Sequence, residues 1–235
     1  SNWADLKTYC EKTSDYEITL SDGIYTPTGE IIVKNNVVIN GNSNAVIGGT
    51  ASNPCSVDYN LFKFLFSNKG LTFNNLNFQY INTTANSIIL LNGLGSSYIN
   101  DCDFTNCYAQ QSHSSIIYLN FGMANVTGCN FKNSNTSFGV ITISGWTNPK
   151  MNVTGSTFED NYASVEPGAI NNCNNLIVMD SIFKRNTASW WAGAIHTHNN
   201  AKTKIYDSTF EDNVANWNGG SLFTYSNLEV YNSTF

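Results

Sequence analysis

The chain has 235 residues, of which 12% are charged and 13% aromatic, and it carries a formal net charge of -6. This composition excludes a disordered segment, because the apolar residues suffice to bury a core, and it excludes a nucleic-acid partner, because binding to phosphates needs clustered Lys and Arg. No apolar run approaches the roughly 18 residues of a membrane-spanning helix, so the sequence predicts no membrane span.

The pattern of apolar residues changes near residue 15. Residues 1–14 carry Trp3, Leu6 and Tyr9 at helical spacing, and residues 15–70 contain strand-like segments such as YEITL and VVINGN. Open strand edges recruit other chains unless they are covered. We therefore expect a capping helix over 1–14 and the first strand-bearing coils over 15–70.

Columns of like residues dominate the chain from residue 71 onward. A phenylalanine recurs every 25 to 27 residues, a second apolar residue stands five positions before it, and a third follows in motifs such as Gly-Ala-Ile. Such a period indicates stacked repeats, in which each unit buries its apolar face only against its neighbours. The first column is Phe78, Phe104, Phe131, Phe158, Phe183, Phe210 and Phe235; the second is Phe73, Ile99, Val126, Val153, Val178, Ile205 and Val230; the third is Ile117, Ile141, Ile170, Ile195 and Leu222.

Three short strands in each repeat predict an all-β chain, a right-handed parallel β-helix solenoid of about eight coils with about 26 residues each. Charges agree with stacking in register, because the pair after the phenylalanine is acidic at 159–160, basic at 184–185 and acidic again at 211–212. We expect a single domain over 1–235, with the capping helix at 1–14, the first coils at 15–70 and the phenylalanine repeats at 71–235. We also expect it to be the N-terminal part of a longer protein.

An asparagine follows each of these charged pairs, at Asn161, Asn186 and Asn213. Stacked carboxamides can hydrogen-bond along the axis of a solenoid, and asparagine tolerates a left-handed backbone. We therefore interpret this column as a ladder of turn residues.

The combination of Phe-x-x-Asn at 158, 183 and 210 with Gly-Ala-Ile at 168 and 193 resembles the repeats of polymorphic outer-membrane proteins and of adhesin-like surface proteins from methanogenic archaea. The motif is clear over 151–235 and degenerate over 71–134, where Ile81, Cys107 and Ser134 replace the asparagine. The first 50 residues resemble the capped start of pectate-lyase-like β-helices. The resemblance implies an extracellular or cell-surface scaffold that binds a glycan or protein of another cell, and we expect no cofactor.

A pectate-lyase-like polysaccharide lyase or a glycoside hydrolase is the alternative function. Such enzymes need carboxylates that converge on one outward strand face. The acids of this chain instead fall into the alternating charge pairs, or recur as turn residues at Asp101, Asp180 and Asp207. This pattern favours a structural role, so we expect a binding protein and assign no catalytic residue.

The six cysteines lack the spacing of a zinc finger or a redox motif. Cys102 and Cys129 stand two positions before the phenylalanine, where small inward side chains are expected. Cys10 and Cys55 either stay free or form a disulfide that fastens the cap, and the sequence leaves both open. Candidate N-glycosylation sites are Asn82, Asn125, Asn135, Asn152 and Asn232.

Tryptophans occur in the loops before two of the third-column strands. Trp190 and Trp217 align in adjacent coils, and their rings either seal the turn or form a ridge for a sugar or another partner. Trp191 decides between these interpretations, because it aligns with Glu166 and Asn218 and is expected to face solvent.

Alternation along the third-column strands predicts an outward recognition face. Tyr118, His196, His198, Phe223 and Tyr225 are its ligand-binding candidates, together with the three tryptophans, because clustered aromatic and polar side chains are typical of contact surfaces. Cys173, His196 and His198 form a weaker candidate metal site. Structural zinc usually takes four close ligands, and this strand geometry offers three.

Overall fold

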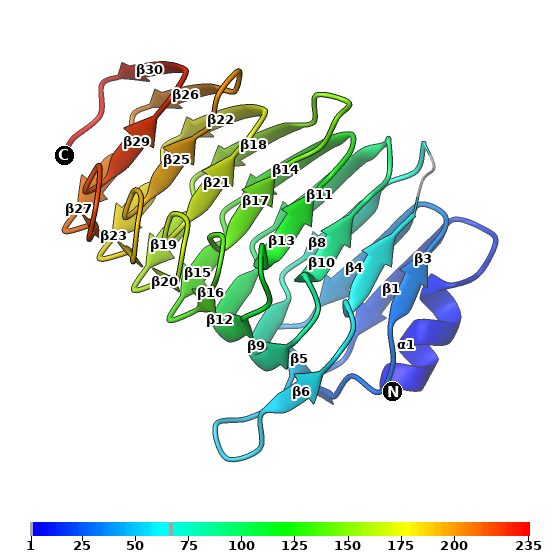
Figure 1. Ribbon diagram of the computed structural model, residues 1–235. Helices are drawn as coiled ribbons and strands as arrows, with labels where there is room; N and C mark the ends of the chain where they lie inside the picture. Colours follow the sequence, from blue (N-terminus) through cyan, green and yellow to red (C-terminus); the bar gives the residue numbers. More distant parts are fainter. Residues whose placement is uncertain (1, 66–67) are drawn as a thin grey trace.

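Every coil of the chain pairs with its neighbours through parallel strands, in a stack that begins at α1 (Trp3–Cys10) and ends at β30 (Asn227–Tyr231) (Figure 1). The computed structural model describes residues 2–65 and 68–235. It is an all-β parallel β-solenoid of about seven turns, which confirms the fold expected from the repeats. The turns number fewer than the expected eight, and the early coils differ in length: Tyr16 pairs with Val37, 21 residues on, whereas Val37 pairs with Leu71, 34 residues on.

Three parallel sheets form the walls of the solenoid. The first sheet has nine strands, in the order β1 (Tyr16–Leu20), β4 (Val37–Gly41), β8 (Leu71–Asn74), β11 (Ser96–Asn100), β14 (Met123–Thr127), β18 (Lys150–Thr154), β22 (Asn175–Met179), β26 (Lys202–Tyr206) and β30. The second has eight strands, in the order β3 (Ile31–Val33), β7 (Phe62–Phe64), β10 (Ser87–Leu91), β13 (Ser115–Leu119), β17 (Ile141–Ile143), β21 (Ile170–Asn172), β25 (Ile195–Thr197) and β29 (Leu222–Thr224).

The third sheet has thirteen strands because it bends within each coil. Its early strands are β2 (Gly23–Tyr25), β5 (Ala45–Gly48), β6 (Cys55–Val57), β9 (Asn77–Thr83) and β12 (Asp103–Ala109). After β12, each coil contributes two short strands in place of one long strand. These pairs are β15 (Asn130–Lys132) and β16 (Asn135–Thr136), β19 (Thr157–Glu159) and β20 (Tyr162–Ala163), β23 (Ile182–Lys184) and β24 (Thr187–Ala188), and β27 (Thr209–Glu211) and β28 (Val214–Ala215).

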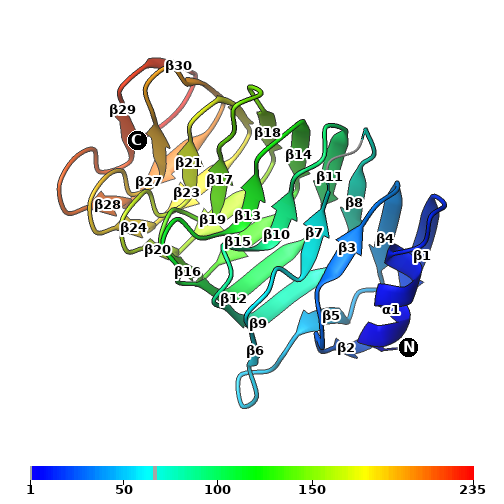
Figure 2. The same cartoon turned by 45° about the vertical axis from the view of Figure 1, so that its right-hand side comes forward.

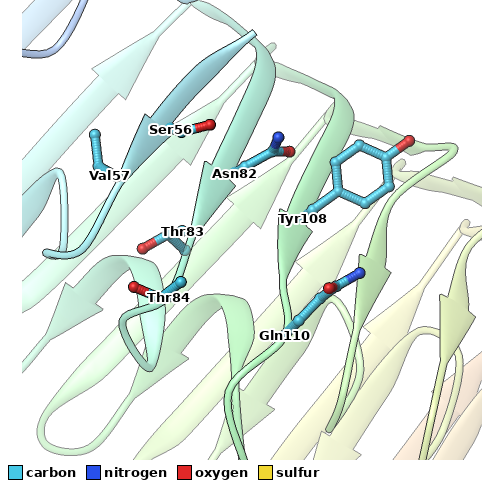
Figure 3. Close-up of a pocket in the computed structure, with 7 residues that line it drawn as sticks. All are labelled: Ser56, Val57, Asn82, Thr83, Thr84, Tyr108 and Gln110. Atoms are coloured by element: carbon cyan, nitrogen blue, oxygen red, sulfur yellow. The ribbon is translucent and has the colours of Figure 1, made fainter.

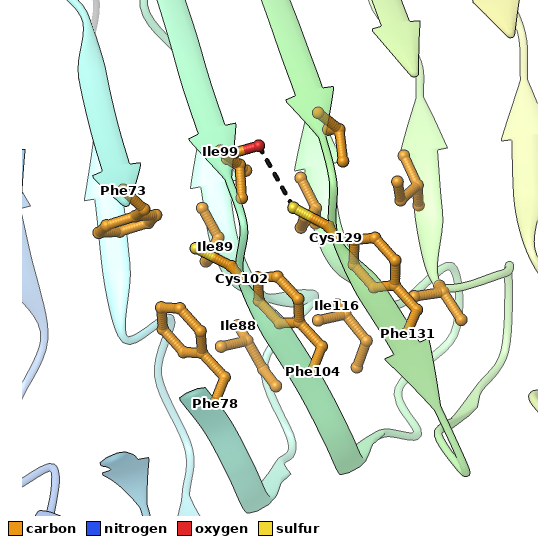
Figure 4. Close-up of a cluster of buried hydrophobic side chains, with 14 of the residues drawn as sticks. Phe73, Phe78, Ile88, Ile89, Ile99, Cys102, Phe104, Ile116, Cys129 and Phe131 are labelled. Carbon is orange, nitrogen blue, oxygen red and sulfur yellow. Dashed lines mark hydrogen bonds between the residues drawn. The ribbon is translucent and has the colours of Figure 1, made fainter. Parts of the chain in front are cut away.

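The phenylalanine column forms a continuous stack of rings in the core. Phe78 and Phe104 stack with ring centroids 4.7 Å apart, Phe158 and Phe183 with centroids 4.8 Å apart, and their rings are nearly parallel. Figure 4 shows Phe78, Phe104 and Phe131 side by side in adjacent coils. Each buried phenylalanine stabilises the fold by about 1.5–3 kcal/mol through the area it removes from water. The predicted column is confirmed, and it fixes the register between coils.

The corner inside the third sheet depends on a residue with a left-handed backbone. Asp160, Arg185 and Asp212 have φ values of 55°, 52° and 53°, so the strand turns at the second member of each charged pair. The predicted turn position was therefore wrong by one residue. The asparagine that follows, such as Asn186, is buried inside the solenoid, because the corner turns its side chain inward.

The buried asparagines form a ladder of hydrogen bonds along the axis. Asn186 Nδ2 donates to the carbonyl of Phe158 at 2.8 Å and to Asn213 Oδ1 at 2.9 Å. Its Oδ1 accepts from the backbone N–H and the side chain of Asn161 in the preceding coil. A buried polar group is tolerated only when it is hydrogen-bonded, so each carboxamide depends on the next coil.

The charged pairs attract one another as expected. Lys132 pairs with Glu159 at 2.8 Å, and Lys184 pairs with Glu211 at 2.8 Å. Arg185 contacts Glu159 and holds the Asp160 carboxylate through two nitrogens. Hydrogen bonds from Arg185 lower the pKa of the Asp160 carboxyl. The pairs are partly exposed and therefore contribute more to register than to stability.

The N-terminal helix covers the edge of the first coil. Trp3 and Leu6 are buried, and Trp3 Nε1 donates to the Gly29 carbonyl at 2.7 Å. Glu11 accepts from the backbone N–H of Ile32 on the edge strand β3 at 2.9 Å. Cys10, rather than the expected Tyr9, is the third buried side chain of this helix. The predicted cap is confirmed within 3–10, and it satisfies a strand edge that would otherwise be open.

Replacing Phe183 by alanine is expected to destabilise the protein by about 3–5 kcal/mol, because it opens a cavity in the middle of the ring stack. Urea unfolding followed by circular dichroism measures the loss. Ile182 precedes Phe183 on β23 and is 44% exposed, so Ile182→Ala is the matched control and should cost less than about 1 kcal/mol. Equal losses for the two variants would contradict the ring stack as the core.

Candidate functional site

Polar and aromatic side chains gather on the outer side of the second sheet, over its C-terminal coils. His196 lies on β25, and its register partners in the adjacent coils are Asn171 on β21 and Phe223 on β29. Ile195 points into the core, so alternation turns His196 and His198 to the outer side. This is the outer strand face that the sequence predicted, and its role in recognition stays a prediction.

The loop between β20 and β21 brings Glu166 onto this face. Its Oε2 lies 2.5 Å from His196 Nδ1 and 3.6 Å from His198 Nε2. This loop packs closely on the next coil because Gly168 within it has no side chain. A Cβ on Gly168 would lie 2.5 Å from the carbonyl oxygen of Gly193. We call Glu166, His196 and His198 the histidine cluster.

His196 is buried, although alternation predicted that it faces solvent. Its exposed fraction is 0%, and that of Glu166 is 4%. Glu166 covers one side of the imidazole, while the rings of Trp191 and Phe223 lie 5.7 and 5.2 Å from it. Alternation gives the direction of a side chain, but it does not show which loop folds back over it.

Opposing effects set the pKa values in the histidine cluster. Burial raises the pKa of Glu166, but hydrogen bonds from His196 and His198 outweigh burial and lower the pKa to about 2. Burial lowers the pKa of His198, but hydrogen bonds with Cys173 and Glu166 outweigh it and raise the pKa to about 9. Glu166 is therefore a carboxylate at neutral pH, held among imidazole rings.

Two polar atoms of this region have no partner. His196 Nε2 and Asn171 Nδ2 are buried and make no hydrogen bond, although Asn171 Oδ1 lies 2.8 Å from His198 Nε2. Buried polar atoms without partners are rare and cost free energy. Their presence beside three potential metal ligands makes this region a candidate site.

Aromatic side chains lie beside the histidine cluster: the rings of Trp191, Phe223 and Tyr225 are near that of His196, and the ring of Trp190 adjoins that of Trp191. Trp190 is 45% exposed and Trp217 is 68% exposed, and their ring centroids lie 5.2 Å apart in adjacent coils. Tyr225 is also exposed, and its ring lies 4.9 Å from that of Phe223. Trp191 is half-buried, contrary to the expectation that it faces solvent, because its ring packs beside His196. We call Trp190, Trp191, Trp217, Phe223 and Tyr225 the aromatic patch.

Tyr118 lies on the same column of the second sheet but away from this patch. Thr142 and Asn171 separate it from His196 in the register. It lines a shallow depression of about 310 Å³ with Asn60, Leu90 and Asn120 among its neighbours. The structure therefore does not bring Tyr118 together with the other predicted ligand-binding residues.

A second shallow depression, of about 330 Å³, lies beside β6, β9 and β12. Figure 3 shows Asn82 and Tyr108 on its wall, with Ser56 and Gln110 nearby. Asn82 Oδ1 has no hydrogen-bond partner. Of the predicted glycosylation residues, Asn232 is exposed, while the side chains of Asn82, Asn125, Asn135 and Asn152 are partly buried; glycosylation stays a prediction.

The cysteines are free thiols in the structure, so the possible Cys10–Cys55 disulfide is absent. Cys10 is buried at the end of α1, whereas Cys55 lies on β6, which pairs with β9 away from the helix (Figure 2). Cys102 and Cys129 occupy small inward positions as predicted, and Cys129 Sγ contacts the Ile99 carbonyl at 3.3 Å (Figure 4). Cys173 was predicted as a metal ligand beside His196 and His198, but the residue grouped with the two histidines is Glu166.

Glu166 was not expected at this site from the sequence. Its only signal is the alignment of its position with Trp191 in the next coil. Both residues belong to loops that precede a third-column strand, and both fold back over the outer face of the sheet.

No protein-family model, curated protein or solved structure matches the chain significantly. The class of protein is therefore defined by its own fold, a parallel β-solenoid with an N-terminal helix. No helix among residues 2–65 and 68–235 is long and apolar enough to cross a membrane.

In the native protein, a thiol-specific reagent is expected to modify Cys173 first, because the other five cysteines are buried and burial raises the pKa of the Cys10 thiol to about 12. Peptide mass spectrometry after brief labelling identifies the modified site, and labelling after unfolding in guanidinium provides the reference for all six. A Cys10–Cys55 peptide linked under non-reducing conditions would contradict the free thiols.

Proposed function

We propose that the chain is an adhesin-like binding scaffold of the cell surface or extracellular space, which recognises a glycan through the aromatic patch. One observation carries this proposal: Trp190 is 45% exposed although its coil is paired on both sides, and its ring adjoins that of Trp217 in the next coil. Exposed apolar patches of this kind are unusual on a soluble protein that binds nothing. The repeat motif, which resembles that of surface adhesins, agrees with this proposal.

A glycan fits the chemistry of the patch better than an apolar ligand. Sugar rings present C–H faces, which pack on aromatic rings, and hydroxyls, which need polar partners nearby. The patch offers both kinds of surface, because Asn216 and Asn218 flank Trp217 and are exposed. The coils hold the rings in place before binding, which reduces the entropy lost when a ligand is bound.

The enzyme alternative finds little support among the described acids. A glycoside hydrolase of the usual kind needs two carboxyl groups that face one another across a substrate. Glu159, Asp160 and Glu211 are held in ion pairs with basic side chains of adjacent coils. Glu166 is the single carboxylate of the histidine cluster and is buried.

A glycan array probed with the labelled chain tests the proposal, followed by titration of the best ligand. Trp217→Ala is expected to weaken binding at least about tenfold, because it removes the most exposed ring of the patch. Trp146 is 97% exposed in the loop between β17 and β18, so Trp146→Ala is the matched control and should bind as the wild type does.

Equal binding by the wild type and Trp217→Ala would overturn the assignment of the patch. Binding to no glycan, together with Trp217-dependent capture of one protein from the surface of intact cells, would replace the glycan with a protein partner.

A further inference from the structure

The histidine cluster brings three potential metal ligands together from two coils. One ligand atom from each of Glu166, His196 and His198 lies within 4.8 Å of the others. Each residue is placed independently: His196 and His198 by strand alternation, and Glu166 by the loop before β21. The grouping is therefore a product of the fold, since 30 residues separate Glu166 from His196.

The separations between these atoms are close to those that a metal ion requires. Zinc binds histidine nitrogen and carboxylate oxygen at about 2.0–2.2 Å, so two ligands of a tetrahedral ion lie about 3.3 Å apart. The Glu166 oxygen lies 2.5 Å from the His196 nitrogen and 3.6 Å from the His198 nitrogen. These two values lie on either side of the required separation, within about 0.8 Å of it, and the ligand nitrogens of His196 and His198 lie within 4.8 Å of each other.

The surroundings favour a bound cation over a set of plain hydrogen bonds. The side chains of His196 and Glu166 are 1% and 5% exposed, and that of His198 is 30% exposed, so the cluster is dry inside and open on one side. His196 Nε2 and Asn171 Nδ2 are buried beside the cluster without partners, so the hydrogen bonding of these two side chains is incomplete. A metal ion would compensate the buried carboxylate at this point.

The donor set identifies the class of metal. Imidazole nitrogens suit zinc and the neighbouring transition metals, whereas calcium and magnesium need oxygen ligands throughout. We propose that Glu166, His196 and His198 bind a divalent transition metal of the zinc class, with one coordination position left to solvent or a ligand. Metal binding replaces the His196–Glu166 and His198–Asn171 hydrogen bonds by bonds to the ion, and the protons of the two ligating nitrogens are released to solvent.

The proposal differs from the set expected from the sequence, which contained Cys173 in place of Glu166. Cys173 contributes to the raised pKa of His198, but it does not share the close grouping of the other three. The metal-site proposal is also independent of the proposed glycan function, because none of its three ligands belongs to the aromatic patch.

Calorimetric titration of the tag-free chain with Zn²⁺ tests the site. We expect one Zn²⁺ per chain, and we expect His196→Ala and the isosteric Glu166→Gln each to weaken binding at least about tenfold. The matched control is His113→Ala, because His113 is exposed and is the one histidine of the sequence outside the cluster. Trp217→Ala should bind Zn²⁺ as the wild type does, even where it fails to bind glycan.

Two further measurements keep the outcome decisive. Circular dichroism checks that each variant folds, and Glu166→Gln keeps the shape of the side chain if His196→Ala does not fold. Visible absorption of the Co²⁺ complex reports the ligands, and nitrogen and oxygen ligation without a thiolate charge-transfer band is expected. Absence of binding by the wild type, or equal binding by Glu166→Gln, overturns the site. Loss of binding in Cys173→Ser would assign the ion to Cys173 and the histidines instead.

Discussion

The strands of each coil form their hydrogen bonds with the strands of adjacent coils, so every sheet is built from many coils. The constraint that follows is register: residues of one coil must lie above like residues of the next, at the separation of paired strands. The phenylalanine rings stack with centroids 4.7–4.9 Å apart along this axis. The buried asparagines donate hydrogen bonds to the asparagines of the adjacent coil. Packing, polar satisfaction and charge pairing therefore all impose one alignment, which is the consistency that a sequence needs to specify a single structure.

A rigid stack has consequences for the outer face of the second sheet. Its strands hold His196, Asn171 and Phe223 in one column, and the loops between coils decide which of these side chains meets solvent. Over β25 the loops carry Glu166 and Trp191 across the sheet, so the histidine is buried among rings while Trp190 and Trp217 stay exposed. The same architecture thus places a buried polar cluster next to a group of aromatic rings, of which Trp190 is exposed.

The fold could be predicted from the sequence because periodicity reports the stack directly. The columns at Phe158, Phe183 and Phe210, and the alternating charges that follow them, need no knowledge of loops. The site could be predicted only in part. Strand alternation placed His196 and His198 on one face, but the burial of His196 depends on a loop from the preceding coil, and loop paths carry no periodic signal. The corner at Arg185 was displaced by one residue for a similar reason: a left-handed residue is usually Gly, Asn or Asp, and here the position is held by its neighbours.

The central claim is that inter-coil ladders hold the structure, and amide hydrogen exchange on Asn186→Asp tests it most directly. The new carboxylate would face the Phe158 carbonyl and the Asn213 Oδ1 that now accept from Asn186. The account predicts that β19, β23 and β27 all lose protection, in the coils on both sides, while the exposed control Asn216→Asp leaves them protected. Loss of protection confined to residue 186 and its immediate neighbours in sequence would contradict it.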